Sequence, residues 1–585
     1  MPRPHASSSR RRGQSSTTRS TDIPTRHWTV LAQDPSILGK GGAALTTTVE
    51  VPAERLERGP KGHRVHVLDY DGSSDTFYGS RTRDLERDPY ARVTDIDRLV
   101  RDPHFHQQNV YALVMSTLFT FERALGRPVD WGFGVPSHQL KVAPHAYLDA
   151  NAGYSRESES LGFGYFFDEQ RTRVYTCLSH DIVVHETTHA LLDGLRSGYW
   201  NPSSPDQAGF HEGFADVAAL LSVFSHHEVI EYALGALKDR EGRIPAGNLT
   251  IDKLGGTALI TLGEQMGSAM EGVKGAVLRH SVTIRPDRRH YTSQTYQEEH
   301  DRGELLVAVV LRAFLGIWIK RLTPLLQSRR SSLATTVVSE EGGTAANHLL
   351  KMVIRALDYL PPVDMTYRDY LSAILTADQE LHPDDTKYHY REALREEFEK
   401  FGIKPASRQD SDGAWEPPPT TDFSLSGMHF ERLQRDPTTV FRFVWENRDQ
   451  LGIFPDAFTR VTSVQPVLRV SRDGTVLRET VAEYVQTLGI YSPELKSLGI
   501  RKPDGMRRSR MIRLYGGGAL IFGEYGQLKF HVGTGVTSKR QTARLQSLWD
   551  NGYFDDESTT ATSARIAQMH RHRALRPAQP PREDW

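Results

Sequence analysis

The chain has 585 residues, of which 38% are hydrophobic and 25% are charged, and its 72 basic side chains balance 73 acidic ones. This composition is that of an ordinary globular protein of about two to four domains, and the balanced charge excludes a general attraction to nucleic acid. The longest apolar run, residues 305–319, contains Arg312 and is shorter than the roughly 18 residues of a membrane-spanning helix, so we expect no membrane partner.

Residues 1–27 are rich in Ser, Arg and Thr without a following apolar stretch, which predicts a disordered tail rather than a secretory signal. The single cysteine, Cys177, excludes an internal disulfide, and we expect a cytoplasmic location. Beyond the tail, hydrophobic periodicity distinguishes strands from helices. The expected elements are a strand at 65–70, a helix at 109–124 ended by Gly126, strands at 139–147 and 163–167, and helices at 181–195, 208–224 and 302–320, with mostly helical chain from there to Phe401.

The composition changes at residues 405–422, which are rich in Pro, Ser and Asp and are typical of an extended linker. We expect this linker to make the parts on either side separable. Beyond it, strand-like runs flank Asp473-Gly474 and Tyr525-Gly526, the pattern of β-hairpins. The predicted organisation of this α+β protein is a disordered tail at 1–27, an N-terminal lobe at 28–200, a helical lobe at 201–404, a linker at 405–422, a strand-rich accessory module at 423–554 and a disordered tail at 555–585.

A metal-binding pattern, His185-Glu186-Thr187-Thr188-His189, lies inside the expected helix at 181–195. Helical spacing of four places both imidazoles on one face, and two neutral histidines suit zinc. Glu186 points at the same site, where it can take a proton from metal-bound water. A chain with 24 histidines can contain such a pattern by chance, so the helical context is what makes it informative.

A catalytic zinc site has three protein ligands and one open position, so a third ligand is needed. The next expected helix offers a candidate. Glu212 is the natural candidate, and Asp216, one turn later, can accept the free N–H of a zinc-bound imidazole. The alternative for both acids is a solvated helix face. The surrounding residues are largely apolar, however, and buried acids need partners.

Several stretches in this region resemble thermolysin and related gluzincins, over roughly residues 109–320. Asn151-Ala152 resembles the edge-strand pair that binds the substrate backbone in that family, and residues 181–184 resemble its lead-in to the zinc helix. Glu212 and Asp216 resemble its third ligand and the acid behind a zinc histidine. The resemblance implies a mixed α/β N-terminal lobe, a helical C-terminal lobe and a zinc-dependent endopeptidase that acts on a peptide or protein substrate.

The same resemblance implies two further catalytic residues. Tyr199 resembles the tyrosine that donates a hydrogen bond to the developing oxyanion, although a structural tyrosine is the alternative. His300 resembles the histidine that stabilises the tetrahedral intermediate, with His290 as a nearby competitor. Residues 217–224 lack the acidic partners of a calcium site near Asp181, so we expect no calcium.

Other sequence patterns are better explained by a structural role than by a ligand-binding or catalytic site. Gly516-Gly517-Gly518 lacks the Lys-Ser or Lys-Thr of a phosphate-binding loop, and Cys177 is expected to be a small buried side chain in a strand-like stretch. The alternative functions are an aminopeptidase, for which the chain shows no anchor motif for a free amine, and a non-catalytic zinc-containing scaffold. The scaffold would act through the accessory module on a partner that the sequence does not identify.

Overall fold

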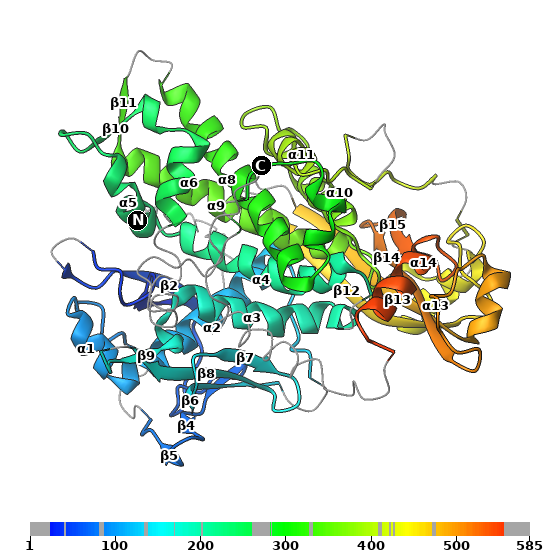
Figure 1. The fold of residues 1–585 in the computed structure, drawn as a ribbon, viewed down its shortest axis with the longest axis horizontal. Helices are drawn as coiled ribbons and strands as arrows, with labels where there is room; N and C mark the ends of the chain where they lie inside the picture. Colours follow the sequence, from blue (N-terminus) through cyan, green and yellow to red (C-terminus); the bar gives the residue numbers. More distant parts are fainter. Residues whose placement is uncertain are drawn as a thin grey trace, which may run out of the picture.

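The structure is a computed structural model, and it shows a mixed α+β protein (Figure 1). It describes residues 24–39, 42–80, 87–133, 138–168, 170–200, 203–259, 281, 284–326, 331–406, 412–419, 423–424, 428–470 and 476–554. The predicted tails therefore lie almost wholly outside the described residues, as does part of the predicted linker. Among the helices that are described, none combines the length and the apolar character needed to cross a membrane.

The N-terminal lobe contains a five-stranded sheet in the order β3-β6-β8-β7, with β9 paired to β8. Its parallel pairs are β3 with β6 and β6 with β8, whereas β7 and β9 run antiparallel to β8. The predicted strands at 139–147 and 163–167 are confirmed, but the one at 65–70 is broken into two short strands. The bounds are β3 Val65–Val67, β4 Tyr70–Asp71, β5 Thr76–Phe77, β6 Leu140–Leu148, β7 Ala152–Ser155, β8 Ser160–Phe167 and β9 Arg173–Tyr175.

A hairpin that the sequence did not predict precedes this sheet. Its strands, β1 Thr25–Leu31 and β2 Thr46–Pro52, pair antiparallel from Thr25 to Pro52. Alternate residues of β2 are buried, which is the pattern of a strand with one face on the core. The strand β1 begins inside the range 1–27, so the last residues of the predicted tail are ordered by this pairing.

The two long helices of the N-terminal lobe are α2 Pro103–Leu125 and α3 His180–Leu195, preceded by the short α1 Ile96–Arg101. The helix α2 begins earlier than predicted because Asp102 accepts a hydrogen bond from the His104 amide and Pro103 occupies the first helical position. Gly126 ends it in the left-handed conformation, at φ 72°, as expected from the sequence. Most side chains of α2 are buried, so this helix forms the centre of the lobe.

The helical lobe is built around α4 and α8, which approach each other closely at glycine residues. A Cβ atom on Gly303 of α8 would lie 3.1 Å from the amide nitrogen of Gly213 on α4, so a larger residue would push the helices apart. The apolar run at 305–319 is buried within α8, as expected. The helices of this lobe are α4 Pro205–Phe224, α5 His227–Ala233, α6 Ile251–Leu259, α8 Glu299–Leu326, α9 Thr335–Arg355, α10 Tyr367–Leu381 and α11 Tyr390–Lys400, and a small sheet joins β10 Arg243–Pro245 to β11 Ser332–Ala334.

The C-terminal part contains an antiparallel sheet in the order β12-β13-β14-β15, which confirms the predicted strand-rich segment. The triple glycine lies within β14 and opens no helix, as expected. The tip of the first hairpin, with Asp473 and Gly474, lies outside the described residues. The elements are α12 Phe430–Leu433, α13 Pro437–Glu446, β12 Phe458–Val470, β13 Val476–Tyr491, β14 Met511–Phe522, β15 Leu528–Thr534 and α14 Arg540–Asp550.

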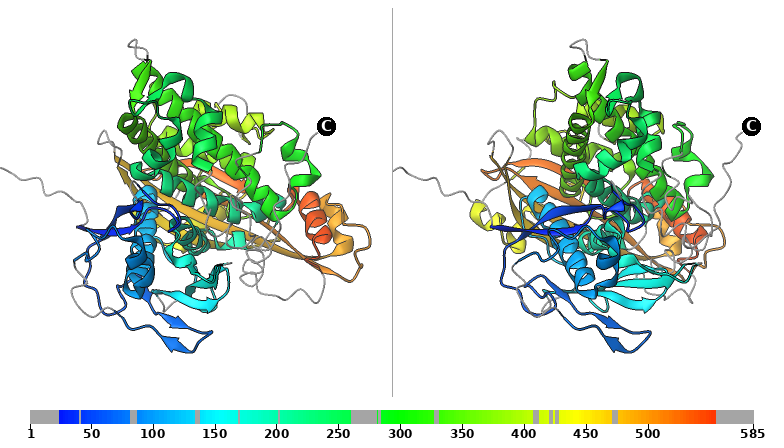
Figure 2. Two further views of the ribbon diagram at one scale, coloured as in Figure 1. Left: turned by 60° about the vertical axis from the view of Figure 1, so that its left-hand side comes forward. Right: turned by 90° about the vertical axis from the view of Figure 1, so that its left-hand side faces the viewer.

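This sheet packs against the helical lobe, and the two share a hydrophobic core. Figure 2 shows the long strands of the sheet, coloured yellow to orange, running alongside the helices. Residues from all four strands join the main core, namely Val467, Val481, Ala519, Ile521, Phe530 and Val532. The position of the boundary at 405–422 stays a prediction. The expectation of separable parts conflicts with this packing, because separation would expose a core face to water.

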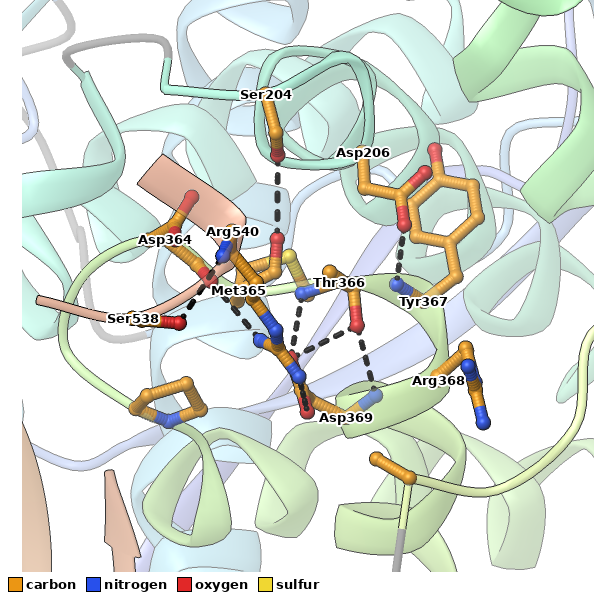
Figure 3. A network of polar contacts seen from close by, with 12 residues as sticks. Ser204, Asp206, Asp364, Met365, Thr366, Tyr367, Arg368, Asp369, Ser538 and Arg540 are labelled. Carbon is orange, nitrogen blue, oxygen red and sulfur yellow. Dashed lines mark hydrogen bonds and ion pairs between the residues drawn. The ribbon is translucent and has the colours of Figure 1, made fainter. Parts of the chain in front are cut away.

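Polar contacts reinforce the same interface. Arg540 of α14 donates to both carboxylate oxygens of Asp369 on α10, at 2.7 and 3.0 Å (Figure 3). Asp369 in turn forms a capping box with Thr366 at the start of α10. Arg469 of β12 forms a buried ion pair with Asp358, between α9 and α10. The sheet is therefore fastened to the helical lobe at several points.

Candidate metal centre

The metal-binding pattern lies in the middle of α3, and the proposed third ligand lies on α4. The structure confirms the helices expected at 181–195 and 208–224, each slightly extended. Ser204 caps α4 by accepting a hydrogen bond from the Gln207 amide, and Pro205 occupies its first position. These signals set where α4 begins, and packing of α3 against α4 brings Glu212 to the histidines.

Three side chains converge between the two helices. Nε2 of His185 lies 3.0 Å from Nε2 of His189. The Glu212 carboxylate oxygens lie 3.7 Å from the former nitrogen and 3.4 Å from the latter. All three residues are buried, and one ligand atom from each lies within 4.8 Å of the others. The structure therefore brings together the residues that the sequence singled out as zinc ligands.

The outer nitrogens of both histidines are held by partners. Nδ1 of His185 donates to Oδ1 of Asp216 at 2.8 Å, as the spacing on α4 predicted. Nδ1 of His189 lies 2.8 Å from Nδ1 of His211. With the outer nitrogens occupied, the two Nε2 atoms present their lone pairs to the shared space. This donor set of two imidazoles and a carboxylate, each braced from behind, fits zinc.

His211 supports the candidate metal centre by contacting His189, and the sequence analysis did not predict this contact. Its ring stacks on that of His189 with centroids 4.9 Å apart and meets Trp200 edge-on. Burial lowers the pKa of His211 to about 4, so the ring is neutral at ordinary pH and can accept a hydrogen bond. Its position directly before Glu212 was visible in the sequence, but contact with His189 depends on how α3 and α4 cross.

Glu186 lies on α3 between the two histidines and is only 3% exposed. Its carboxylate is therefore held in the interior, where general bases are shielded from bulk water. This placement is compatible with the role that the sequence indicated.

The strand β7 runs at the edge of the N-terminal sheet, directly after Asn151. Tyr154 of this strand donates to Asp193 near the end of α3, at 2.8 Å, and Arg156 forms an ion pair with the same carboxylate. These contacts hold β7 beside α3. Asn151 and Ala152 are both buried, and their predicted role in binding substrate stays a prediction.

His300 lies in the first turn of α8, three residues before Gly303 and so on the same helix face. A Cβ atom on Gly303 would lie 3.4 Å from Cβ of Glu212, so this part of α8 packs against α4 next to a candidate ligand. Glu298 holds the His300 ring through Nδ1 at 3.4 Å. Nε2 of His300 is buried and has no hydrogen-bond partner among the residues that the structure describes.

The competitor His290 is engaged differently. Its Nε2 donates to the carbonyl oxygen of Arg285 at 3.0 Å, so that nitrogen already has an acceptor. The hydroxyl of Tyr199 also has an acceptor already, because it donates to the carbonyl oxygen of Pro361 at 2.6 Å. The geometry therefore favours His300 over His290, and it favours the structural alternative for Tyr199.

Comparison of the sequence with models of protein families gives no match, and comparison with curated proteins gives no significant match. The chemistry of the centre is therefore inferred from its own residues. These are the ligand group His185, His189 and Glu212, the partners Asp216 and His211, and the buried Glu186.

Proposed function

We propose that this chain is a zinc-dependent endopeptidase with a thermolysin-like catalytic unit, in which His185, His189 and Glu212 hold the metal. The observation that carries the proposal is the convergence of two braced Nε2 atoms and a carboxylate in the interior. In this arrangement the N-terminal lobe and the helical lobe correspond to the two lobes implied by the resemblance. The substrate is a peptide or protein.

His185, His189 and Glu212 would hold zinc, which would supply Lewis acidity that lowers the pKa of a water molecule toward neutrality. Glu186 accepts the proton of the attacking water and later passes it to the leaving amine. His300 donates from Nε2 to the oxygen that becomes negative, while Glu298 accepts from its Nδ1 and fixes the ring.

The edge strand β7 supports an endopeptidase in particular. Among the described strands it pairs only with β8, and the edge of a sheet is where an extended peptide can be added as a further strand. Main-chain pairing of this kind holds a peptide by its middle and does not require a free terminus.

Two substitutions separate this proposal from the non-catalytic scaffold. Glu186→Gln keeps the shape of the side chain but cannot accept a proton, so we expect it to retain zinc and to lose peptide cleavage. Glu212→Ala removes a ligand, so zinc content and cleavage should both fall. The measurements are zinc stoichiometry and digestion of an unbiased peptide library.

Glu241→Gln, on an exposed turn, is the matched control and should behave as the wild type. The peptidase proposal fails if Glu186→Gln cleaves at the wild-type rate, or if the wild type binds no zinc. Zinc binding without cleavage by the wild type would favour the scaffold.

A further inference from the structure

A second group of metal-ligating side chains lies away from the candidate centre, inside the N-terminal lobe. It consists of His106 on α2, His145 on β6 and Cys177 on the short 3-10 helix η2 Thr176–Leu178. One ligand atom from each lies within 4.8 Å of the others. The three residues are at most 1% exposed.

The hydrogen bonds of the two histidines determine what their facing nitrogens can do. Nε2 of His106 lies 2.9 Å from the carbonyl oxygen of Val100, which can only accept, so Nε2 carries the proton. Nδ1 of His145 lies 2.8 Å from Oδ1 of Asp69 and donates to that carboxylate. In neutral rings this leaves lone pairs on Nδ1 of His106 and on Nε2 of His145.

Those two nitrogens lie 2.8 Å apart. Two lone pairs at this distance repel unless a cation lies between or beside them. Both rings are buried, and the Cys177 thiol lies beside them as a third donor for such a cation.

The arrangement repeats the pattern of the candidate metal centre. There, too, two imidazole nitrogens face each other at 3.0 Å while the outer nitrogens are held by partners. Here a backbone carbonyl and a carboxylate brace the rings, which is the usual support behind metal-binding histidines. A thiolate replaces the carboxylate as the third donor.

We propose that His106, His145 and Cys177 form a second zinc site, which has a structural role. Two imidazoles and one thiolate are donors that zinc prefers, and a solvent molecule can complete the tetrahedron. With the Cys177 thiolate and the Asp69 carboxylate, a divalent ion gives a cluster of zero net charge, which suits the interior. The thiol proton is released to solvent when the metal binds.

The location explains the structural role. The three ligands come from the start of α2, the middle of the sheet and the turn that leads into α3. The rings of Tyr78 and Tyr175 pack on His145 with centroids 4.5 and 5.3 Å away, so no substrate can approach it. A metal here would lock the sheet to the helices just before the segment that carries His185.

Cobalt provides a sharp test, because a cobalt–thiolate bond gives a charge-transfer absorption in the near ultraviolet. Cys177 is the only cysteine in the chain, so such a band can come from this residue alone. We expect the full-length protein, produced in cobalt-containing medium, to show the band and to carry about two metal ions per chain. Glu212→Ala should keep the band and lose about one ion.

Cys177→Ala should lose the band and about one metal ion, and it should retain the ion held by His185 and His189. Should that variant not fold, His106→Gln serves instead and should weaken or abolish the band. The matched control is His180→Gln, since His180 is equally buried but its ring contacts the Leu31 carbonyl and the Ser222 hydroxyl. It should keep the band.

A wild type without the band overturns the proposal and leaves a shared proton as the occupant of the cluster. Loss of the band in Glu212→Ala overturns it as well, because the thiolate would then depend on the other centre. The cobalt–thiolate band tests this site independently of the peptidase proposal, whereas the count of two ions also requires the site at His185, His189 and Glu212. An inactive wild type with the band supports the second site, and an active one without the band contradicts it.

Discussion

Nδ1 of His189 and Nδ1 of His211 face each other at 2.8 Å, so one imidazole orients another directly behind the candidate metal centre. One of the two nitrogens has to donate. Because burial keeps His211 neutral, with its pKa lowered to about 4, its Nδ1 can accept from the N–H of His189. That tautomer leaves the lone pair of His189 on Nε2, where a metal ligand needs it.

Replacement of His211 by Leu should therefore weaken zinc binding by about 10- to 100-fold, the usual cost of removing a partner behind a metal-binding histidine. His211→Asn restores an acceptor and should recover most of the affinity. Competition with a chelator of known affinity measures both variants. Equal zinc affinity in the Leu variant and the wild type would show that His189 is oriented by other contacts.

His300→Phe should lower the turnover number by about 100-fold or more while zinc stays bound, since a single oxyanion contact typically supplies about 3 kcal/mol. His290→Phe is the matched control and should change the turnover number little, because the Nε2 of His290 already donates to Arg285. Steady-state kinetics on one peptide, with zinc analysis of each variant, checks this. The reverse ranking would assign the oxyanion role to His290.

The contact between the C-terminal sheet and the helical lobe predicts a single cooperative unfolding transition. Arg469 bridges Asp358 and Glu479, and both of its ion pairs are buried. Arg469→Met leaves two buried carboxylates without this cation and should lower the free energy of unfolding by about 3–5 kcal/mol.

The control for this substitution is Arg478→Met, because the ion pair of Arg478 with Glu524 is exposed. It should change the free energy of unfolding by less than about 1 kcal/mol. Denaturant titrations followed by fluorescence and circular dichroism measure both. Two separate transitions in the wild type would restore the picture of independent parts.

Asp364 makes stability depend on pH. Burial raises its pKa from 3.8 to about 6, against the opposing effect of Arg544 and Arg540. The folded protein thus holds this proton more tightly than the unfolded chain does. The resulting stabilisation is complete below about pH 4 and is lost as the pH rises through 6, by at most about 3 kcal/mol.

Asp364→Asn cannot ionise and should be more stable than the wild type at pH 7, with no such loss between pH 4 and 7. Asn also tolerates the positive φ of 55° at this position. Asp412→Asn is the control, because Asp412 also has a positive φ, of 51°, but its side chain is 93% exposed. Melting temperatures across this pH range test the prediction, and identical pH profiles for wild type and Asp364→Asn would contradict it.

The candidate metal centre was accessible from the sequence because its key spacings lie within single helices. Residues four apart on α3 or α4 share a face wherever the helix packs, so His185 with His189, and Glu212 with Asp216, could be grouped in advance. His211 could not, because its partner lies on another helix. Tyr199 was assigned by resemblance alone, and its hydroxyl bonds to the carbonyl oxygen of Pro361, which lies 162 residues later in the chain.

The C-terminal sheet shows that composition says little about how two parts of a chain pack against each other. The linker is rich in residues that favour extended chain, but this says nothing about the faces of the sheet beyond it. Residues 479–484 of β13 are buried consecutively, which means that both faces of the strand are covered. Two of them are Glu479 and Glu483, whose charges suggest exposure in the sequence but pair with arginines in the structure.

The shared core also limits how early the protein can finish folding during its synthesis. The helices α3 and α4 leave the ribosome long before β15, yet Phe530 and Val532 of that strand belong to the same hydrophobic core as those helices. Until Phe530 and Val532 have been synthesised, the apolar surface that these two residues cover stays accessible to water and to chaperones. The nascent chain therefore keeps α3 and α4 in an incomplete fold until almost all of the described residues have been synthesised.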